Sequence, residues 1–217
     1  MAFPNLELRA SCQRFLSGHL PRTQRTWLAE MAASPLADLR LDSYNEGPAI
    51  ALLEEEVAAR LGKEAALFIH KGVTAQQMAL RVWTDRSGKR AVALHPKSHI
   101  DLDERQAYER LHPIVGLRVG AEHHPFTLQQ LQALHEPCGA IVIELPLRRA
   151  GYKLLPWEEL VAISTWAHEE GIPLHFDGAR LWECAPFYGR SYADIAALAD
   201  SVYVSFYKGL GGLAGCI

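Results

Sequence analysis

Residues 172–180 read IPLHFDGAR, and residues 201–212 read SVYVSFYKGLGG. Each stretch opens with a short apolar run and then changes abruptly to charged residues and glycine. Apolar runs of this length, bounded by turn-forming residues, are typical of buried strands. Polar side chains of an α/β sheet acquire functions at the carboxyl ends of the strands, where the loops form the ligand crevice. These two junctions therefore show where a functional site should lie.

The same alternation extends over most of the chain. Short apolar runs predict strands at 65–70, 90–95, 113–119, 139–145, 172–177 and 201–206, with the beginning of another at 213–217. Segments with helical spacing predict helices at 22–33, 49–61, 73–83, 99–111, 126–135, 157–171 and 194–199. Strands that alternate with helices in this way predict an α/β fold, with a mostly parallel sheet sandwiched by helices.

The layout predicts two parts of unequal size. Residues 1–40 are expected to form an N-terminal helical arm, and residues 41–217 a large domain. The chain ends at Ile217, inside an apolar run that has the pattern of a strand. Chain termini normally lie at the surface, so a buried strand is an unusual place to end. We therefore expect the large domain to be incomplete at its C-terminus.

Composition excludes several classes of protein. The chain has 217 residues, 22 Lys and Arg against 25 Asp and Glu, and a formal net charge of −3, with 49% hydrophobic residues. This balance predicts no nucleic-acid partner, and the absence of a long apolar run predicts no membrane association. Four scattered cysteines and an N-terminus unlike a signal peptide favour a cytoplasmic protein. The ten histidines have no ligand-like spacing with carboxylates, so we expect no metal site.

Asp177 and Lys208 are the residues of greatest chemical interest. A carboxylate that ends a strand as apolar as IPLHF would be desolvated, and a lysine among glycines after an apolar strand is equally unusual. Each has an ordinary alternative: Asp177 could cap the next turn and pair with Arg180, and Lys208 could be a lysine of a surface loop. Together they match one chemical need, in which a lysine forms a Schiff base with an aldehyde cofactor and an acid pairs with the protonated pyridine nitrogen of that cofactor.

Two further junctions are candidates for ligand contacts. The helix expected after Gly72, Val73 and Thr74 would offer free backbone N–H groups and the positive end of a helix dipole to a phosphate. His99 could stack on a flat ring or cap its own helix. The glycines after Lys208 also fit the dinucleotide pattern G-x-G-x-x-A, but that fingerprint requires a following helix, which 213–217 does not predict.

Four stretches of the chain resemble the threonine aldolase and β-eliminating lyase family of enzymes that depend on pyridoxal 5′-phosphate (PLP). They are YNEGPAIALLEEEVAARLGKEAALF (44–68), SHI (98–100), PLHFDGARLWECA (173–185) and DSVYVSFYKGLGGLAG (200–215). The resemblance implies the aspartate-aminotransferase-type fold, with this chain forming the large domain of the PLP-dependent transferase type. It also implies a small C-terminal domain that the sequence does not contain.

The resemblance assigns roles to individual residues. Lys208 would form the Schiff base with PLP, Asp177 would pair with the pyridine nitrogen, and His99 would stack on the ring. Arg180 would lie near the phenolic oxygen of the cofactor, and Gly72, Val73 and Thr74 would hold its phosphate. Lys208 and His99 are then the expected catalytic residues.

The sequence also departs from the family pattern. The phosphate turn has Val73 where the family has threonine, and Ser17, the expected substrate-binding residue, is followed by glycine instead of aspartate. Leu147 stands where threonine aldolases place a histidine implicated in cleavage of the β-hydroxy side chain. Tyr207 precedes the lysine where serine is usual.

The resemblance implies a lyase whose substrate is a small-molecule amino acid. The expected reaction cleaves a β-hydroxy-α-amino acid to glycine and an aldehyde. Two alternatives stay open: a β-elimination that gives an oxo acid, and a catalytically degenerate protein with the same fold. The family builds its cofactor pocket between subunits, and the loop at 44–50 places Tyr44 and Ile50 where they could cover a neighbour. We therefore expect a homodimer or homotetramer.

Overall fold

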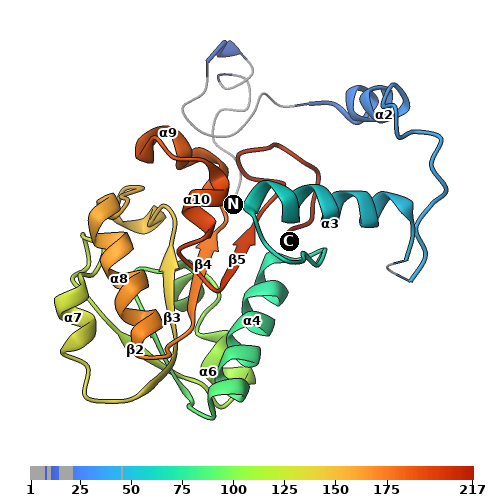
Figure 1. Ribbon diagram of the computed structural model, residues 1–217. Helices are drawn as coiled ribbons and strands as arrows, with labels where there is room; N and C mark the ends of the chain where they lie inside the picture. Colours follow the sequence, from blue (N-terminus) through green and yellow to red (C-terminus); the bar gives the residue numbers. More distant parts are fainter. Residues whose placement is uncertain (1–7, 9–10, 15–21, 45) are drawn as a thin grey trace.

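The centre of the molecule is a five-stranded sheet in which every neighbouring pair of strands is parallel (Figure 1). The computed structural model describes residues 8, 11–14, 22–44 and 46–217. The strand order is β2-β1-β3-β4-β5. The strands are β1 (Ala91–Leu94), β2 (Val115–Arg118), β3 (Cys138–Glu144), β4 (Leu174–Gly178) and β5 (Ser201–Val204). The predicted α/β fold with a parallel sheet is confirmed.

Helices cover both faces of this sheet, with α4 and α6 on one face and α7 and α8 on the other (Figure 1). The α-helices of the described chain are α2 (Gln24–Ala32), α3 (Pro48–Leu61), α4 (Gly72–Ser87), α5 (His99–Leu102), α6 (Ala107–Leu111), α7 (Leu128–Gln132), α8 (Trp157–Glu169), α9 (Ala185–Tyr188) and α10 (Tyr192–Ala196). Two short 3₁₀ helices, η1 (Arg148–Ala150) and η2 (Leu181–Glu183), follow β3 and β4. None of the described helices is both long and apolar enough to cross a membrane.

The central strand β3 shows how the sheet divides the core in two. Successive side chains of a strand point to opposite faces. Ala140 and Val142 accordingly pack in the cluster that contains residues of α4, whereas Ile141 and Ile143 pack in the cluster that contains residues of α8. Because both faces are buried, the strand reads as a continuous apolar run, as parallel strands do.

The predicted strands at 65–70 and 213–217 are wrong. In their place the structure has isolated antiparallel bridges, one joining Ile69 to Cys216 and another joining Ser205 to Cys216. The backbone N–H of Phe68 donates instead to the Glu54 carboxylate of α3, at 2.6 Å. Gly215 has a φ of +91°, which bends the chain out of an extended path. The apolar residues of both segments are thus used for packing and not for a strand ladder.

The helix predicted at 99–111 is interrupted. Arg105 and Gln106 both have φ near +55°, in the left-handed region, and a right-handed helix cannot continue through two such residues. The segment therefore forms two short helices, α5 and α6, that meet at a turn. Helices α2, α7 and α8 are shorter than predicted, α4 extends further, to Ser87, and α9, η1 and η2 were not predicted.

The N-terminal part is described in fragments. The helix predicted at 22–33 is present as α2, and Thr23 caps it by accepting a hydrogen bond from the backbone N–H of Thr26. No residue of α2 is buried, and the helix lies away from the sheet (Figure 1). The division of the chain at residue 40 stays a prediction.

Candidate active site

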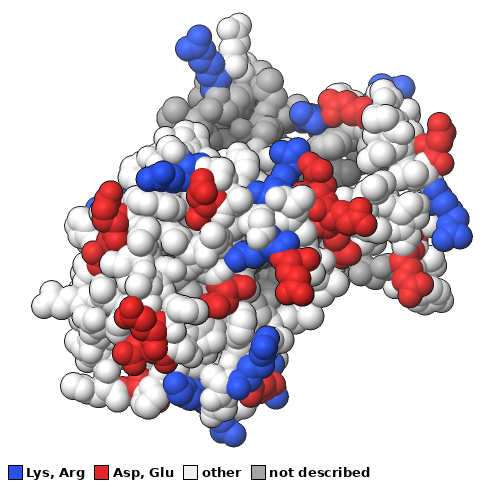
Figure 2. All heavy atoms as spheres, in the orientation of Figure 1, with Lys and Arg blue, Asp and Glu red and all other residues white. Residues whose placement is uncertain are grey.

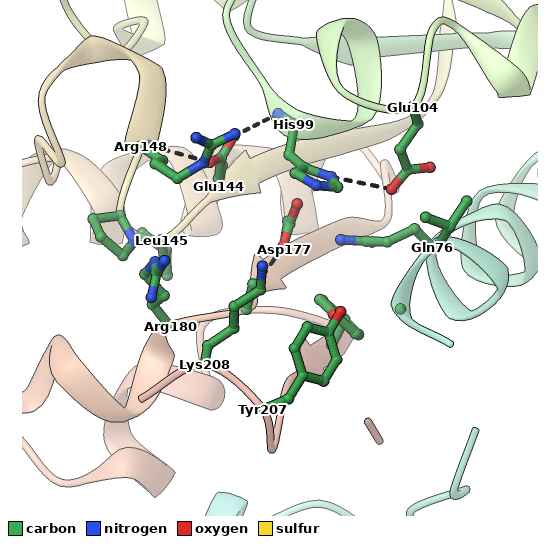
Figure 3. A pocket seen from close by; sticks show the side chains of 15 residues that line it. Gln76, His99, Glu104, Glu144, Leu145, Arg148, Asp177, Arg180, Tyr207 and Lys208 are labelled. Carbon is green, nitrogen blue, oxygen red and sulfur yellow. Dashed lines mark hydrogen bonds and ion pairs between the residues drawn. The ribbon is translucent and has the colours of Figure 1, made fainter. Parts of the chain in front are cut away.

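A cavity lies at the carboxyl ends of β3, β4 and β5, against the first turn of α4 (Figure 3). The empty space in it is about 580 Å³, part of which is open solvent. Its walls are formed by Gly72, Val73, Gln76, His99, Glu104, Glu144, Leu145, Pro146, Arg148, Asp177, Ala179, Arg180, Tyr203, Tyr207 and Lys208. Residues from five separate stretches of the chain therefore converge at the edge of the sheet that the sequence indicated.

Six of the eight predicted site residues line this cavity: Gly72, Val73, His99, Asp177, Arg180 and Lys208. Thr74 is exposed and does not line it, so only its backbone N–H is placed to serve a ligand at the start of α4. Ser17 lies outside the described residues. No group of three or more described His, Cys, Asp or Glu side chains is arranged to hold a metal ion.

Asp177 lies in β4 directly beside Glu144 of β3, because the register of the two parallel strands pairs them. It is 1% exposed. Burial, and after it the charge of Glu144, raises the pKa of Asp177 to about 7. The hydrogen bond that its carboxylate accepts comes from the backbone N–H of Ala179, at 3.3 Å. The carboxylate thus lies on the cavity floor with little to stabilise its charge.

The alternative in which Asp177 caps the next turn and pairs with Arg180 is correct only in its first half: Asp177 accepts from the backbone N–H of Ala179 but does not pair with Arg180. The Arg180 guanidinium contacts Glu183 at 3.5 Å and lies 5.5 Å from the centre of the Tyr152 ring. Arg180 nevertheless lines the cavity. Asp177 therefore remains available to a cation that enters the cavity.

Lys208 follows β5, and its amine points into the cavity toward Asp177 (Figure 3). The ammonium nitrogen is 5.0 Å from the centre of the Tyr207 ring. Burial, and after it the nearby charges of Arg180 and Arg148, lowers the pKa of Lys208. A half-buried amine of this kind is not the surface lysine of the ordinary alternative, and its reduced basicity is typical of nucleophilic lysines.

Glu144 and Glu104 hold His99 between them. The backbone N–H of His99 donates to Glu144 at 2.7 Å, and the imidazole Nδ1 lies 3.2 Å from Glu104. The hydrogen bond to Glu104 raises the pKa of His99. Ser98, and not His99, caps helix α5. The alternative in which His99 serves as a cap is therefore wrong, and its ring is left to face the cavity.

The first turn of α4 reaches the cavity because Gly72 has no side chain. A Cβ at this position would collide with the Tyr203 hydroxyl and come within 3.1 Å of the Tyr207 hydroxyl. The helix can therefore begin against the cavity wall, where its free N–H groups favour an anion. Gly209 and Gly212 do not line the cavity; a Cβ on them would meet Glu183 and Phe206.

Four charged or amide residues of the site were not predicted as site residues, nor were Tyr203 and Tyr207; the four are Gln76, Glu104, Glu144 and Arg148. The sequence did contain a signal for Glu144: it is a charged residue at the end of the most apolar strand, as Asp177 is near the end of β4. Gln76 follows Gly72 by four positions, which places both on one face of α4. Arg148 follows Leu147, and Leu147 itself is 3% exposed and does not line the cavity.

The charged surface offers no single dominant sign on the face drawn in Figure 2. Lys and Arg side chains lie interspersed with Asp and Glu over the helices that surround the sheet. This distribution agrees with a net charge of −3.

Comparison with known proteins gives a consistent result. The family model for beta-eliminating lyases matches residues 23–217. Aldolase vrtJ of Penicillium aethiopicum is 31% identical over 209 residues, which are 94% of this chain and 53% of that protein. The low specificity L-threonine aldolase of Escherichia coli (strain K12) is 28% identical over 207 residues, which are 93% of this chain and 60% of that protein.

Solved structures share the fold at higher identity. A Listeria monocytogenes structure, whose description proposes an L-allo-threonine aldolase, superimposes with a TM-score of 0.90 at 43% identity and covers 98% of this chain and 59% of its own. An Exiguobacterium structure, whose description proposes an aromatic amino acid beta-eliminating lyase/threonine aldolase, gives a TM-score of 0.87 at 41% identity, covering 92% and 56%. The chain spans about half the length of the curated relatives it matches.

Proposed function

The chain belongs to the beta-eliminating lyase family, and from that premise we propose that the full-length protein is a PLP-dependent lyase. It cleaves a β-hydroxy-α-amino acid to glycine and an aldehyde. The observation that carries the proposal is that Lys208, Asp177 and the first turn of α4 face one cavity. The relatives named as threonine aldolases support the same reaction class.

The residues of the cavity fit the cofactor. PLP has an aldehyde, a basic ring nitrogen and a phosphate, and these require an amine, an acid and a set of N–H donors. Lys208 supplies the amine. Asp177 is a buried carboxylate whose charge the surrounding chain stabilises poorly, so a protonated ring nitrogen would relieve it. The first turn of α4, beginning at Gly72, supplies the donors.

When bound, the cofactor supplies an electron sink for the bonds at the Cα atom of the amino acid. Lys208 Nζ would hold the cofactor covalently. Because its pKa is lowered, Nζ can also take up and release a proton more readily than an exposed lysine. Asp177 would keep the proton on the ring nitrogen. Arg180, at the cavity wall, would lie near the phenolic oxygen of the cofactor.

Cleavage of a β-hydroxy side chain requires removal of the hydroxyl proton. Leu147 cannot do this, since it is apolar and lies outside the cavity. His99 is the cavity residue best suited, because Glu104 orients its ring and stabilises the imidazolium that forms. We assign His99 as the base, in addition to its expected place against the cofactor ring.

A β-elimination is the second candidate. It is favoured by Leu147, which replaces the histidine expected in an aldolase, and by Arg148 beside it, whose guanidinium reaches the cavity and also contacts Asp103 at 2.6 Å. An arginine there could hold an acidic group of the substrate. In this reaction the substituent on Cβ leaves and the product is an oxo acid.

A product assay on the full-length protein separates these functions. L-Threonine, L-allo-threonine, serine and cysteine are incubated with the PLP-loaded protein, and glycine and oxo acids are quantified. Glycine and acetaldehyde in equal amounts from the threonines would support the aldolase. Pyruvate from serine or cysteine without glycine would replace it with the eliminating lyase. A protein that binds no PLP would be the degenerate form.

We also propose that the protein is at least a homodimer. Tyr44 is 99% exposed and Leu41 is 89% exposed, while Leu28 and Met31 of α2 are exposed as well. Exposed apolar side chains that gather within residues 28–44 favour burial of this segment against a second copy. Sedimentation of the full-length protein is expected to show a dimer or tetramer; a monomer that still binds PLP tightly would contradict it.

We also propose a cytoplasmic location, because a reducing compartment suits the four free cysteines.

A further inference from the structure

Gln76 is buried at the cavity wall and has an unused hydrogen-bond donor. It lies in the second turn of α4 and is 1% exposed. Its side-chain Nε2 is buried and has no hydrogen-bond partner. The amide end points toward Asp177 across the cavity floor (Figure 3). A buried NH₂ group without an acceptor is unfavourable, so its presence in a cavity points to an acceptor that it serves.

A chain of hydrogen bonds holds this amide from behind. Trp83 Nε1 donates to Ser201 Oγ at 2.7 Å. Ser201 Oγ lies 2.8 Å from His175 Nδ1, and His175 Nε2 lies 2.8 Å from Gln76 Oε1. The four residues, which we call the Trp83 relay, join two distant parts of α4 through strands β4 and β5.

The relay has a direction. An indole N–H can only donate, so Ser201 Oγ accepts from Trp83. At the other end of the relay, the Gln76 Oε1 atom can only accept, so His175 Nε2 carries the proton that it donates to Gln76. His175 is neutral, because burial lowers its pKa to about 4. A neutral imidazole has one N–H, so with Nε2 donating to Gln76, Nδ1 accepts from the Ser201 hydroxyl. The oxygen of the Gln76 amide is thereby engaged, and the NH₂ group is directed into the cavity.

The Asp177 carboxylate is the acceptor toward which this donor points (Figure 3). It accepts a hydrogen bond from Ala179, at 3.3 Å. The other charged groups that act on it are Glu144 at the end of β3, Glu104 after α5, His99 in α5 and Lys208 after β5. The two glutamates disfavour its charge. A neutral amide donor stabilises the charged form of Asp177 but does not neutralise it. The negative charge therefore remains available to a cation that enters the cavity.

We propose that Gln76 is a positioning residue for Asp177: its Nε2, which has no partner among the described residues, shifts to donate to the Asp177 carboxylate when that carboxylate ionises and aims it at the ring nitrogen of the cofactor, while the Trp83 relay fixes the amide oxygen. The role of the cofactor in this statement rests on the proposed function. The hydrogen bond itself does not, since it can be tested without cofactor.

Three variants of the full-length protein test the proposal. Gln76→Leu removes the donor at similar volume. Ser201→Ala breaks the relay at a residue outside the cavity, and serves if Gln76→Leu fails to fold. Thr84→Val is the matched control, because Thr84 is also a buried residue of α4 and its hydroxyl bonds only to backbone carbonyls of the same helix.

Two readouts are measured for each variant: the titration of Asp177 by carboxyl ¹³C NMR without cofactor, and the dissociation constant for PLP at pH 7. We expect Gln76→Leu to move the Asp177 titration to higher pH and to weaken PLP binding at least about tenfold, as for loss of one hydrogen bond to a charged group. Ser201→Ala should act in the same direction and less strongly, and Thr84→Val should change neither.

An unchanged Asp177 titration in Gln76→Leu, or in Ser201→Ala if only that variant folds, would overturn the proposal. A purely structural role of Gln76 would lower the stability of Gln76→Leu and leave the titration of Asp177 unmoved. If the wild-type protein binds no PLP, the proposed function fails, and the titration without cofactor still decides whether Gln76 positions Asp177.

Discussion

Two aspartates of this molecule are almost equally buried and have opposite surroundings. Asp101 of α5 is 2% exposed, and Asp177 of β4 is 1% exposed. The Asp101 carboxylate accepts from the Tyr108 hydroxyl at 2.6 Å and from two nitrogens of Arg118 at 2.8 and 2.9 Å. The Asp177 carboxylate accepts from the backbone of Ala179 at 3.3 Å and lies beside Glu144.

The difference separates a structural charge from a functional one. Asp101 is neutralised within its own part of the chain and ties α5 to α6 and β2. Asp177 has a pKa raised to about 7, because it is buried and, after that, because it lies beside Glu144 with little compensation. Such a site is tolerated where a ligand completes it. Removing a carboxylate that is paired within the chain, such as Asp101, should reduce stability. Removing one that is left for a ligand, such as Asp177, should reduce activity.

The largest effect is expected for Lys208→Ala. Loss of the amine should abolish turnover in the full-length protein, because no other described lysine lines the cavity. The stability cost should be small, roughly 1 kcal/mol, since the charged amine is already disfavoured by burial. Turnover and urea unfolding are measured on the same preparation. Wild-type turnover in the variant would show that Lys208 is structural.

The two aspartates can then be compared directly with asparagine substitutions. Asp101→Asn should destabilise the protein by about 2 kcal/mol, because hydrogen bonds to a charged group are lost, and should retain turnover. Asp177→Asn should leave stability at pH 8 unchanged or higher and should lose PLP affinity. Chemical unfolding and PLP titration give the two quantities. Equal destabilisation by both substitutions would remove the distinction between the aspartates.

The pH dependence of stability should differ between wild type and Asp177→Asn without cofactor. The folded pKa of Asp177 is raised above the unfolded value of about 3.9, so the folded state binds the proton more tightly. Its contribution to stability is complete below pH 4 and is lost as pH rises to about 7. We expect the wild type to lose stability relative to Asp177→Asn over this window, by at most about 1.4 kcal/mol per pH unit. Parallel stability curves would contradict this.

The smallest effect is expected for Glu104→Gln. Glu104 raises the pKa of His99, so His99 is protonated over a wider range and becomes a base only above that pKa. Removing the carboxylate should lower the pKa of His99, and the acid limb of kcat/KM should move to lower pH. Glu183→Gln, on the far side of Arg180, is the control. An acid limb that does not move would exclude His99 as the base.

The sequence predicted the site better than it predicted the elements around it. Asp177 and Lys208 were found because a charge at the end of an apolar run is conspicuous, and parallel strands bring such ends together. Gln76 and Glu104 could not be found in this way. An uncharged amide in a helix, such as that of Gln76, is common. Its importance here depends on its contact with His175 and, through His175, on Ser201, which lie about 100 and 125 residues away in the chain.

The wrong strands have a similar cause. Residues 65–70 and 213–217 are as apolar as true strands, but strand formation depends on a partner along the whole segment. In the structure the backbone of Phe68 bonds to Glu54, and Gly215 bends the second segment. Local composition indicates burial in both cases; it does not indicate which backbone groups are paired.

The central claim, that Lys208 is the residue to which PLP attaches, can be tested by chemical trapping. The full-length protein is incubated with PLP, reduced with borohydride, digested and analysed by mass spectrometry. We expect one modified peptide with the phosphopyridoxyl group on Lys208, and its loss in Lys208→Ala. Modification of another lysine in preference to Lys208, or no stable modification at saturating PLP, would contradict the account.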